Sequence, residues 1–196
     1  MANKVKFGLS NVMYSVATVT VSTGGTYTYS YGTPKPLKGA VNLSLEANGE
    51  LTPFRADNVD YWVASSNNGY EGDFELALVP DSFLTDVLGF ATDDNNVLYE
   101  SADVQPSPFA LLFQFEGDSK ARRHVMYNCT ATRPAVASQT TDTSISPVTE
   151  TLSIKASPRL DTHIVKASTA ENDNTSAQYT GWYSSVYEVD TTPATT

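Results

Sequence analysis

Apolar and polar residues alternate in steps of two along much of the chain. In residues 40–46, for example, Val41, Leu43 and Leu45 are separated by polar residues. Side chains of a β-strand point alternately to its two faces, so this alternation is typical of a strand that buries one face. The same alternation, or a run rich in Val, Thr and aromatic residues, predicts further strands at residues 12–22, 26–31, 70–79, 109–115, 122–130 and 151–155.

Two of these runs carry the clearest apolar faces. In residues 109–115, the aromatic and leucine side chains recur at every second position and predict one continuous buried face. In residues 122–130, Val125, Tyr127 and Cys129 alternate with other residues and are expected to share a face. The thiol of Cys129 is therefore predicted to be buried rather than reactive.

Turn residues separate the predicted strands at short intervals. Gly24-Gly25 is expected to join residues 12–22 to residues 26–31. Asn48-Gly49 is a strong signal for a tight hairpin turn. Gly117-Asp118 and the adjacent Ser119 predict a third turn, which pairs residues 109–115 with residues 122–130.

One helix is predicted, at about residues 81–89. Asp81 or Ser82 can cap its start, and Gly89 is placed to end it. A helix of about two turns is not stable alone and must pack against a sheet. The sequence therefore predicts a mainly β fold of two packed antiparallel sheets, a sandwich or small barrel, with one short flanking α-helix. The apolar face of the helix consists of Phe83, Leu84, Val87 and Leu88.

Two segments differ from the alternating pattern. Residues 51–72 are expected to form a long polar loop with aromatic residues, and a loop of this length usually has a function. Residues 168–196 are rich in Ser, Thr, Asn and Asp but also carry Trp182 and several tyrosines. We expect one more strand there, or an arm that docks on a neighbour, with residues 191–196 disordered. Residues 1–167 are then one β domain.

Composition narrows the class of protein further. The chain of 196 residues has 22 acidic and 12 basic residues, for a formal net charge of -10, so its charge does not attract nucleic acid. Solubility is the simplest role for this charge. The single cysteine excludes an internal disulfide and a cysteine-built zinc site. No signal peptide or membrane-spanning stretch is recognisable, so synthesis and folding in a cytoplasm are expected.

Catalytic motifs are missing from the sequence. His124 and His163 are the only histidines, and there is no nucleophile elbow or glycine-rich phosphate loop. The acidic run at residues 93–96 lacks the spacing of a calcium loop and is interpreted as a turn. We therefore predict no enzyme activity, cofactor or metal. A basic patch at Lys120, Arg122, Arg123 and His124 is interpreted either as a contact with an acidic neighbouring subunit or as a charged strand end that prevents unwanted pairing.

Several sequence pieces, in a fixed order, point to a known family. They read GAVNLSLE at residues 39–46, TPFRADN at 52–58, NNGYEGDFELALVP at 67–80 and FLTDVLG at 83–89. Two further pieces are RRHVMYNCTATRP at residues 122–134 and TETLSIKASPR at 149–159. Together they resemble the major tail proteins of siphophages, which are bacteriophages with long non-contractile tails. The resemblance covers roughly residues 5–166.

The resemblance implies a tail-tube fold and a structural role. Subunits of this family form hexameric rings whose inner sheets join into one barrel around a channel, and the rings stack through loops and arms. The implied partners are further copies of the chain, the tape-measure protein and other tail proteins. DNA would pass through the channel without specific binding, and an acidic channel wall would repel its phosphates. The implied location is the virion tail, assembled in the host bacterial cytoplasm.

On this interpretation, the functional residues lie at subunit interfaces rather than in a pocket. Two other functions stay open: a carbohydrate-binding or adhesin-like β-sandwich, whose C-terminal Tyr and Trp residues stack on sugars, and a glycosidase that uses two carboxylates. No suitable carboxylate pair stands out for the second. The candidate interface residues are Pro53, Phe54, Arg55, Asp57, Tyr61, Trp62, Tyr70, Arg122, Arg123 and Trp182.

Overall fold

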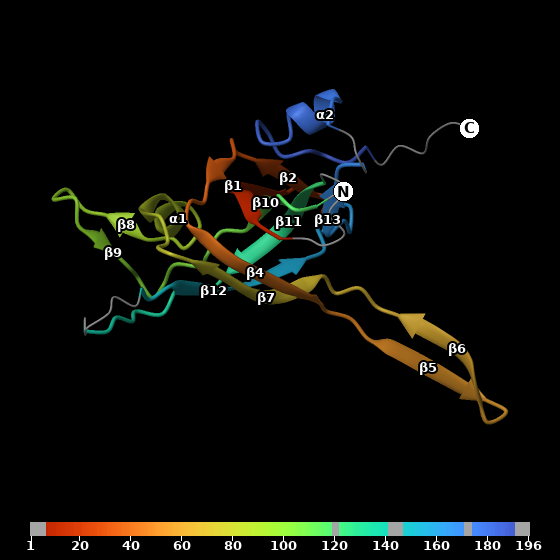
Figure 1. Ribbon diagram of the computed structural model, residues 1–196. Helices are drawn as coiled ribbons and strands as arrows, with labels where there is room; N and C mark the ends of the chain where they lie inside the picture. Colours follow the sequence, from red (N-terminus) through yellow and green to blue (C-terminus); the bar gives the residue numbers. More distant parts are fainter. Residues whose placement is uncertain (1–6, 119–121, 141–146, 171–173, 191–196) are drawn as a thin grey trace.

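The protein is mainly β, as the sequence predicts. The computed structural model describes residues 7–118, 122–140, 147–170 and 174–190. Their regular structure consists of one large antiparallel sheet, two small sheets and two short helices (Figure 1). Lys120 and the expected disordered end, residues 191–196, lie outside the described residues.

The strands are β1 (Leu9–Val21), β2 (Tyr27–Tyr31), β3 (Lys35–Pro36), β4 (Ala40–Ala47), β5 (Leu51–Ala56), β6 (Val59–Ser65), β7 (Tyr70–Leu76), β8 (Ala91–Thr92), β9 (Leu98–Tyr99), β10 (Phe109–Phe115), β11 (Arg123–Ala131), β12 (Glu150–Ser157) and β13 (Lys166–Ser168). The helices are α1 (Asp81–Asp86) and α2 (Ala177–Thr180).

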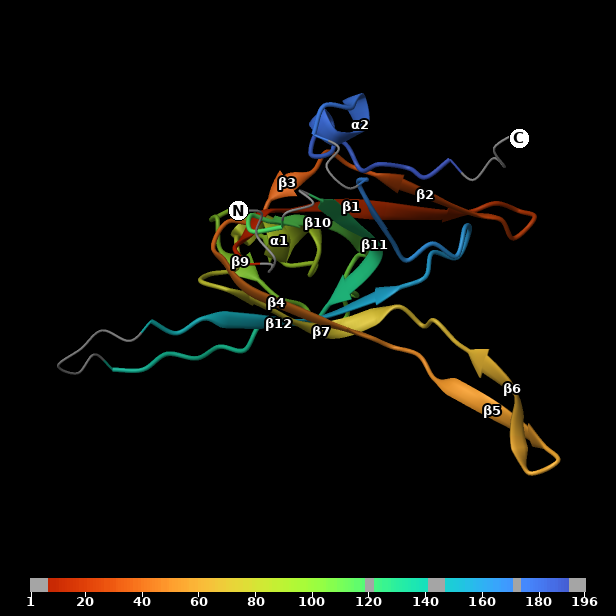
Figure 2. The ribbon, with the colours of Figure 1, turned by 45° about the vertical axis from the view of Figure 1, so that its right-hand side comes forward.

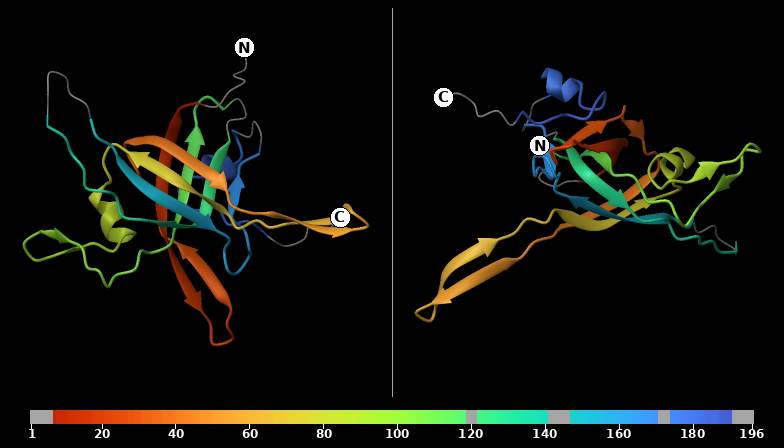
Figure 3. Two further views of the ribbon diagram at one scale, coloured as in Figure 1. Left: turned by 90° about the horizontal axis from the view of Figure 1, so that it is seen from below. Right: turned by 180° about the vertical axis from the view of Figure 1, so that it is seen from behind.

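The large sheet is continuous and folds over on itself. Its strands run in the order β2-β1-β10-β11-β12-β7-β4, with β3 beside β1 and β13 beside β11. Strand β11 belongs to both halves, because Met126 lies opposite Lys166 of β13 and Cys129 lies opposite Ala156 of β12. The halves face one another as two layers whose strands cross steeply (Figure 3). The predicted packed layers are thus present, and a single bent sheet supplies both.

A bulge in β11 sends its apolar residues to two faces. The prediction that Val125, Tyr127 and Cys129 share one face is wrong. The register against β10 shifts by one residue within β11, so Met126 and Cys129 face the space between the layers, whereas Val125 and Tyr127 point to the other side. Cys129 is fully buried, as predicted, and burial raises the pKa of its thiol to about 12.

Helix α1 closes one end of the space between the layers. Its Phe83 is fully buried and makes edge contacts with Tyr14 of β1 and Phe109 of β10, with ring centroids 5.0 and 5.4 Å apart. The helix ends at Asp86, three residues before the predicted end at Gly89, which does adopt a left-handed φ of +77°. The predicted capping by a side chain is wrong, because Pro80 occupies the N-cap position and no side chain bonds there.

Polar contacts tie α1 to the β1 layer. The hydroxyl of Tyr14 donates to Asp86 at 2.8 Å, and the ammonium of Lys35 donates to the same carboxylate oxygen at 2.6 Å. Burial alone would raise the pKa of Asp86, but the hydrogen bonds from Lys35 and Tyr14 more than offset it, so the pKa is lowered. The end of the helix is therefore fixed by a charged group as well as by packing.

The C-terminal residues cover the other face of the β1–β10–β11 layer. Residues 174–190, here called the strap, include α2 and lie on the side of this layer away from β12, β7 and β4 (Figure 1). The strap places Trp182 and Val186 in a second buried cluster with Leu112, Val125 and Tyr127. In place of an added strand or an arm on a neighbour, the structure shows a short helix and an extended segment packed on their own chain.

Residues 51–65 form a projecting β-hairpin, here called the arm. Strands β5 and β6 pair antiparallel and extend away from the body (Figure 2). The two-residue turn is Asp57-Asn58, whose φ angles of +51° and +63° suit these residue types. The predicted loop at residues 51–72 is therefore wrong, and so is the predicted turn at Asn48-Gly49, which lies at the base of the arm. There the Asn48 N–H donates to the Gly69 carbonyl at 2.9 Å.

Candidate assembly surfaces

The arm is an isolated two-stranded sheet. Strands β5 and β6 pair only with one another among the described strands. A lone hairpin of this kind is marginally stable in water, because it has no third strand or helix to cover its side chains. Yet Phe54 is 60% exposed, Tyr61 72% and Trp62 62%. Such large apolar groups, gathered on a projecting element, mark a surface that another molecule covers.

The pairing register shows how the arm distributes its side chains. Phe54 lies directly opposite Trp62, and Ala56 lies opposite Val59. Paired residues share a face, and so do positions two apart, which places these four side chains on one face. We call this set the apolar face of the arm. It carries no charge, whereas the opposite face bears the Arg55–Asp60 ion pair.

The arm gathers six of the predicted interface residues. Pro53 lies opposite Val63 on the second face, Arg55 forms an exposed ion pair with Asp60 at 3.0 Å, and Asp57 sits in the turn. An exposed pair of this kind contributes little stability, so the arm depends on apolar contacts. Tyr70 is separate from this group: it is half-buried in β7, at the base of the arm. The six are Pro53, Phe54, Arg55, Asp57, Tyr61 and Trp62.

Arg123 contacts its own chain rather than presenting a free charge. Its guanidinium lies 3.9 Å from the ring centroid of Tyr179 and 4.9 Å from that of Tyr183, and it donates to the Tyr179 carbonyl. Arg122 is half-buried, and its backbone N–H donates to Asp118 at 3.4 Å. The basic residues beside the β10–β11 turn are thus partly used to hold the strap, which the sequence could not show.

Trp182 is likewise an intrachain contact. It is only 3% exposed, stacks on Tyr187 with ring centroids 5.4 Å apart, and its indole N–H donates to the His124 carbonyl at 3.4 Å. The candidate role of Trp182 at a subunit interface is therefore replaced by a role in seating the strap. The hydroxyl of Tyr127 adds a 2.7 Å hydrogen bond to the Tyr187 carbonyl.

Arg159 is a functional residue that no pattern in the sequence singles out. It is 5% exposed and forms two hydrogen bonds with Asp161, at 2.9 and 2.6 Å, and one with Glu188 of the strap at 2.6 Å. The hydrogen bonds from Arg159 lower the pKa of Asp161, against the effect of burial. The rings of Tyr29 and Tyr127 lie 4.9 and 5.6 Å from the guanidinium. Arg159 thus links the strap to the sheet.

The outer face of β12, β7 and β4 is polar and acidic. Its central strand β7 carries Glu71, Asp73 and Glu75 at alternate positions, which point away from the core residues Phe74 and Leu76. Each carboxylate accepts a hydrogen bond from a neutral side chain, and none forms an ion pair with another described residue. The donors are Asn48 to Glu71 at 3.0 Å, Ser153 to Asp73 at 2.9 Å and Thr149 to Glu75.

The flanking strands complete this acidic face. Glu46 and Lys155 lie beside Glu71, and small Ser, Thr and Asn side chains lie beside the other two carboxylates. A hollow of about 520 Å³ lies over part of this face and is lined by residues of β7, β11 and β12, none of them aromatic. Without an aromatic ring the hollow lacks the stacking surface on which a sugar-binding site relies.

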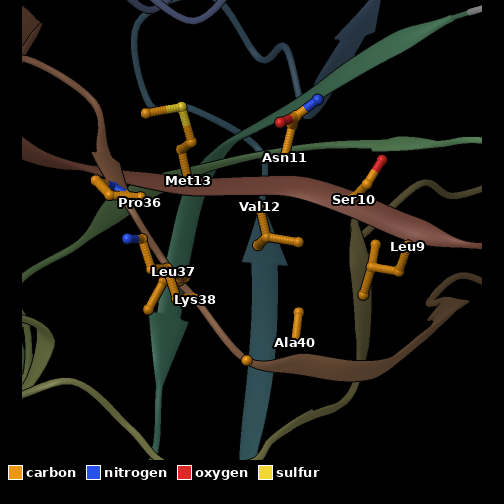
Figure 4. A pocket seen from close by; sticks show the side chains of 10 residues that line it. Leu9, Ser10, Asn11, Val12, Met13, Pro36, Leu37, Lys38 and Ala40 are labelled. Atoms are coloured by element: carbon orange, nitrogen blue, oxygen red, sulfur yellow. The ribbon is translucent and has the colours of Figure 1, made fainter.

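A second opening lies between β1 and the β3–β4 connection. It has a volume of about 420 Å³, and Figure 4 shows Leu9 and Val12 pointing toward Ala40, whereas Asn11 and Met13 point to the other side of β1. Lys38 is the only charged residue of the lining, so the opening has no acid–base pair.

The described residues show no metal site and no membrane-spanning helix. Among the described residues, no group of three or more His, Cys, Asp or Glu side chains is arranged to hold a metal ion. Asp93 caps the β8–β9 turn by accepting from the backbone N–H groups of Asn95 and Val97, as expected for a turn. None of the described helices has the length and apolar character needed to cross a membrane.

The surfaces that distinguish this chain are therefore an apolar arm, an acidic sheet face and a strap held on its own sheet. Comparison with known proteins adds no family assignment: no family model matches the chain, and no curated protein is significantly similar to it.

Proposed function

We propose that this chain is a structural subunit of a phage tail tube, forming stacked hexameric rings around a DNA-conducting channel. The ordered motifs between residues 39 and 159 support this function, and so does the mainly β fold of two packed layers with a flanking helix. Its partners would be further copies of itself, the tape-measure protein and other tail proteins. No enzymatic step is part of the proposal.

The observation that carries the proposal is the arm. Both of its faces are rich in exposed apolar groups, with Phe54 and Trp62 on one face and Leu51 on the other. A hairpin with exposed apolar groups on both sides is suited to burial between two other molecules. In the proposed assembly, the arm of one copy contacts a different region of the next copy. Such head-to-tail contacts generate rings or filaments.

The acidic face of β12, β7 and β4 supplies a wall for the channel in this proposal. A wall that carries Glu71, Asp73 and Glu75 repels the phosphates of DNA, which prevents DNA from adhering as it moves. At physiological salt, repulsion extends over roughly 8 Å, so it acts on DNA that closely approaches the wall. The small neutral side chains of the flanking strands leave this face smooth.

The carbohydrate-binding alternative loses its main support. It depended on exposed aromatic residues near the C-terminus, but Trp182 is buried, and Tyr179 and Tyr183 hold Arg123. The remaining exposed aromatic residues of the arm lie on a projecting hairpin instead of in a groove. Self-assembly accounts for that position better than sugar binding does.

Electron microscopy of the purified full chain tests the proposed function. We expect rings or tubes with a central hole in negative stain, with their proportion rising with protein concentration because assembly is a mass-action process. Small uniform particles at every concentration, together with binding to a glycan array, would instead support the carbohydrate-binding alternative.

The acidic wall makes a separate prediction about DNA transport. The double variant Glu71→Gln/Asp73→Asn changes the net charge from -10 to -8 (-10 + 2 = -8) and preserves the size of both side chains. We expect tubes to form as before but DNA ejection from particles to slow severalfold, because the wall repels phosphate less. Ejection is followed by the release of dye-stained DNA from purified virions.

The control for this prediction changes the same charge elsewhere. Asp94→Asn/Asp103→Asn also gives a net charge of -8 but alters exposed residues near the β8–β9 hairpin. Ejection from the control should match that of the unaltered protein. Equal ejection rates for both double variants and the unaltered protein would show that β7 does not line the channel.

A further inference from the structure

The space between the two layers is closed at one end and open at the other. Helix α1 fills the first end, where Phe83 packs on Phe109. At the end nearer the arm lies a cavity of about 270 Å³, lined by residues of β4, β7, β10, β11 and β13. We call this cavity the mouth. Its lining includes the apolar side chains of Leu43, Leu45, Tyr70, Phe113, Phe115 and Met126, together with His124 and Lys166.

The mouth is lined mainly by apolar side chains and has a charged residue at its edge. The lining residues Leu43, Leu45 and Phe115 are only partly buried, although they pack against the main core. The ammonium of Lys166 lies at the rim, 4.3 Å from the ring centroid of Tyr70. An apolar opening of this kind leaves core side chains in contact with water, which is unfavourable until an apolar group enters.

The arm of the same molecule does not fill the mouth. It leaves the body through Asn48 and Gly69 and continues outward (Figure 2). A Cβ at Gly69 would lie 1.9 Å from the Ala156 carbonyl oxygen, so this close backbone approach constrains the base of the arm. The chain therefore carries an apolar face and an apolar cavity that it does not bring together itself.

We propose that the mouth receives the apolar face of the arm from a second copy of the chain, with Phe54 or Trp62 inserted between the layers. The cavity has room for one large aromatic side chain, and the arm presents two such side chains directly opposite each other. This inference rests on the proposed self-assembly and specifies which surfaces meet.

Charge favours a second copy as the occupant. The chain has a net charge of -10, so two copies repel one another over most of their surfaces. The apolar face of the arm carries no charge, and the rim of the mouth carries the cation Lys166. The two surfaces can therefore approach without bringing like charges together, which is the condition for a specific contact between identical acidic chains.

Two complementary variants test this contact. In the first, Phe54→Ser/Trp62→Ser removes the aromatic groups of the arm and leaves the mouth intact. In the second, Leu45→Arg fills the mouth and leaves the arm intact. We expect each variant alone to be monomeric in size-exclusion chromatography with light scattering. An equimolar mixture should give one-to-one dimers, at least tenfold more stable than either like pair, because only one functional contact can form.

A mixture that stays monomeric, with both variants folded by circular dichroism and the unaltered chain forming tubes, would overturn the arm-to-mouth contact while leaving the tube proposal intact. Failure of the unaltered chain to assemble under any condition would instead count against the proposed function itself. The absence of higher oligomers is part of the expected result, since neither variant can extend a chain of contacts.

Cross-linking provides a readout that does not depend on the Leu45→Arg variant folding. A Val59→Cys variant is mixed with a Leu45→Cys variant and mildly oxidised, and native Cys129 does not compete because it is fully buried. A disulfide-linked dimer is expected. Leu78→Cys replaces Leu45→Cys in the control, because Leu78 is exposed but lies outside the mouth. Equal yields with both partners, or no dimer with Leu45→Cys, would exclude the contact.

Discussion

Replacing residues 51–65 with a two-residue Asn-Gly turn is expected to abolish tube formation and to leave a folded monomer. The design is feasible because Glu50 and Ser66 already face one another at the base of the arm. The Ser66 N–H donates to the Glu50 carbonyl at 3.0 Å, and the Glu50 N–H donates to the Ser66 hydroxyl at 2.9 Å. A tight turn can therefore close the strands at this point.

The body should keep its stability because the arm contributes no side chain to either buried cluster. Removing it also removes exposed apolar area, which makes the monomer more soluble. We expect the urea midpoint of the shortened chain to match that of the unaltered monomer, whereas electron microscopy should show no rings or tubes at any protein concentration. Loss of assembly without loss of stability would separate the role of the arm from a role in folding.

Arg55→Gln is the matched control for this deletion. It breaks the exposed ion pair with Asp60 but keeps Phe54 and Trp62 on the apolar face. Because exposed ion pairs contribute little, tubes should form from this variant as they do from the unaltered chain. Tubes from the arm-deleted chain would show that assembly uses other surfaces, such as the free edges of β2 and β4.

The parts of the fold that the sequence predicted are those with one buried and one exposed face. In β12, Leu152, Ile154 and Ala156 are buried and alternate with exposed residues, so the period of two is visible in the sequence. The Gly24-Gly25 turn between β1 and β2 and the pairing of β10 with β11 are confirmed for the same reason. In these strands, the alternation of apolar and polar residues in the sequence matches the alternation of buried and exposed side chains in the fold.

The sequence pattern does not predict the arm, because neither face of this hairpin packs against the body. Both of its faces carry apolar groups, so polar and apolar positions do not alternate, and Pro53 further weakens the strand signal. The strong turn signal at Asn48-Gly49 therefore predicts the hairpin turn at the wrong position. The real turn at Asp57-Asn58 uses residue types that tolerate positive φ, but without glycine it gave a weaker signal.

The strap shows a different limit of sequence reasoning. Trp182 and Arg123 have the residue types expected at an interface, and they do lie at one, but the interface is within the chain. Residue type indicates that a side chain needs a partner and leaves open which chain provides it. The contact between Arg159 and Glu188 spans 29 positions and follows no local pattern, so only the folded chain reveals it.

Arg159→Ala is expected to have the largest effect on stability of any single substitution outside the apolar core. It would leave the carboxylate of Asp161 and the hydroxyl-bearing ring of Tyr127 facing an empty space. Removing one member of a buried ion pair destabilises a protein by roughly 3–5 kcal/mol. The side chain of Glu188 is 51% exposed and partly screened by water, so we expect a loss at the lower end of this range. The free energy of unfolding, measured with urea, should fall by an amount on the order of 3 kcal/mol.

The ion pair should also make stability depend on pH. The pKa of Asp161 is lowered by Arg159 in the folded chain, so its contribution is complete above the unfolded pKa of about 4. That contribution is lost as the pH falls through the lower, folded pKa. Below pH 4, the difference in unfolding free energy between the unaltered chain and the Arg159→Ala variant should therefore shrink.

Arg133→Ala is the control for Arg159→Ala, because Arg133 also pairs with a glutamate but both side chains are exposed, at 50% and 38%. Its effect on the free energy of unfolding should stay below about 1 kcal/mol.

A Trp62→Phe background makes Trp182 the only tryptophan, so its fluorescence reports the strap directly. In that background, Arg159→Ala should shift the emission of Trp182 to longer wavelength as Glu188 releases the strap and water reaches the indole. Unchanged emission with a large loss of stability would mean that Arg159 stabilises the sheet while Arg123 alone holds the strap.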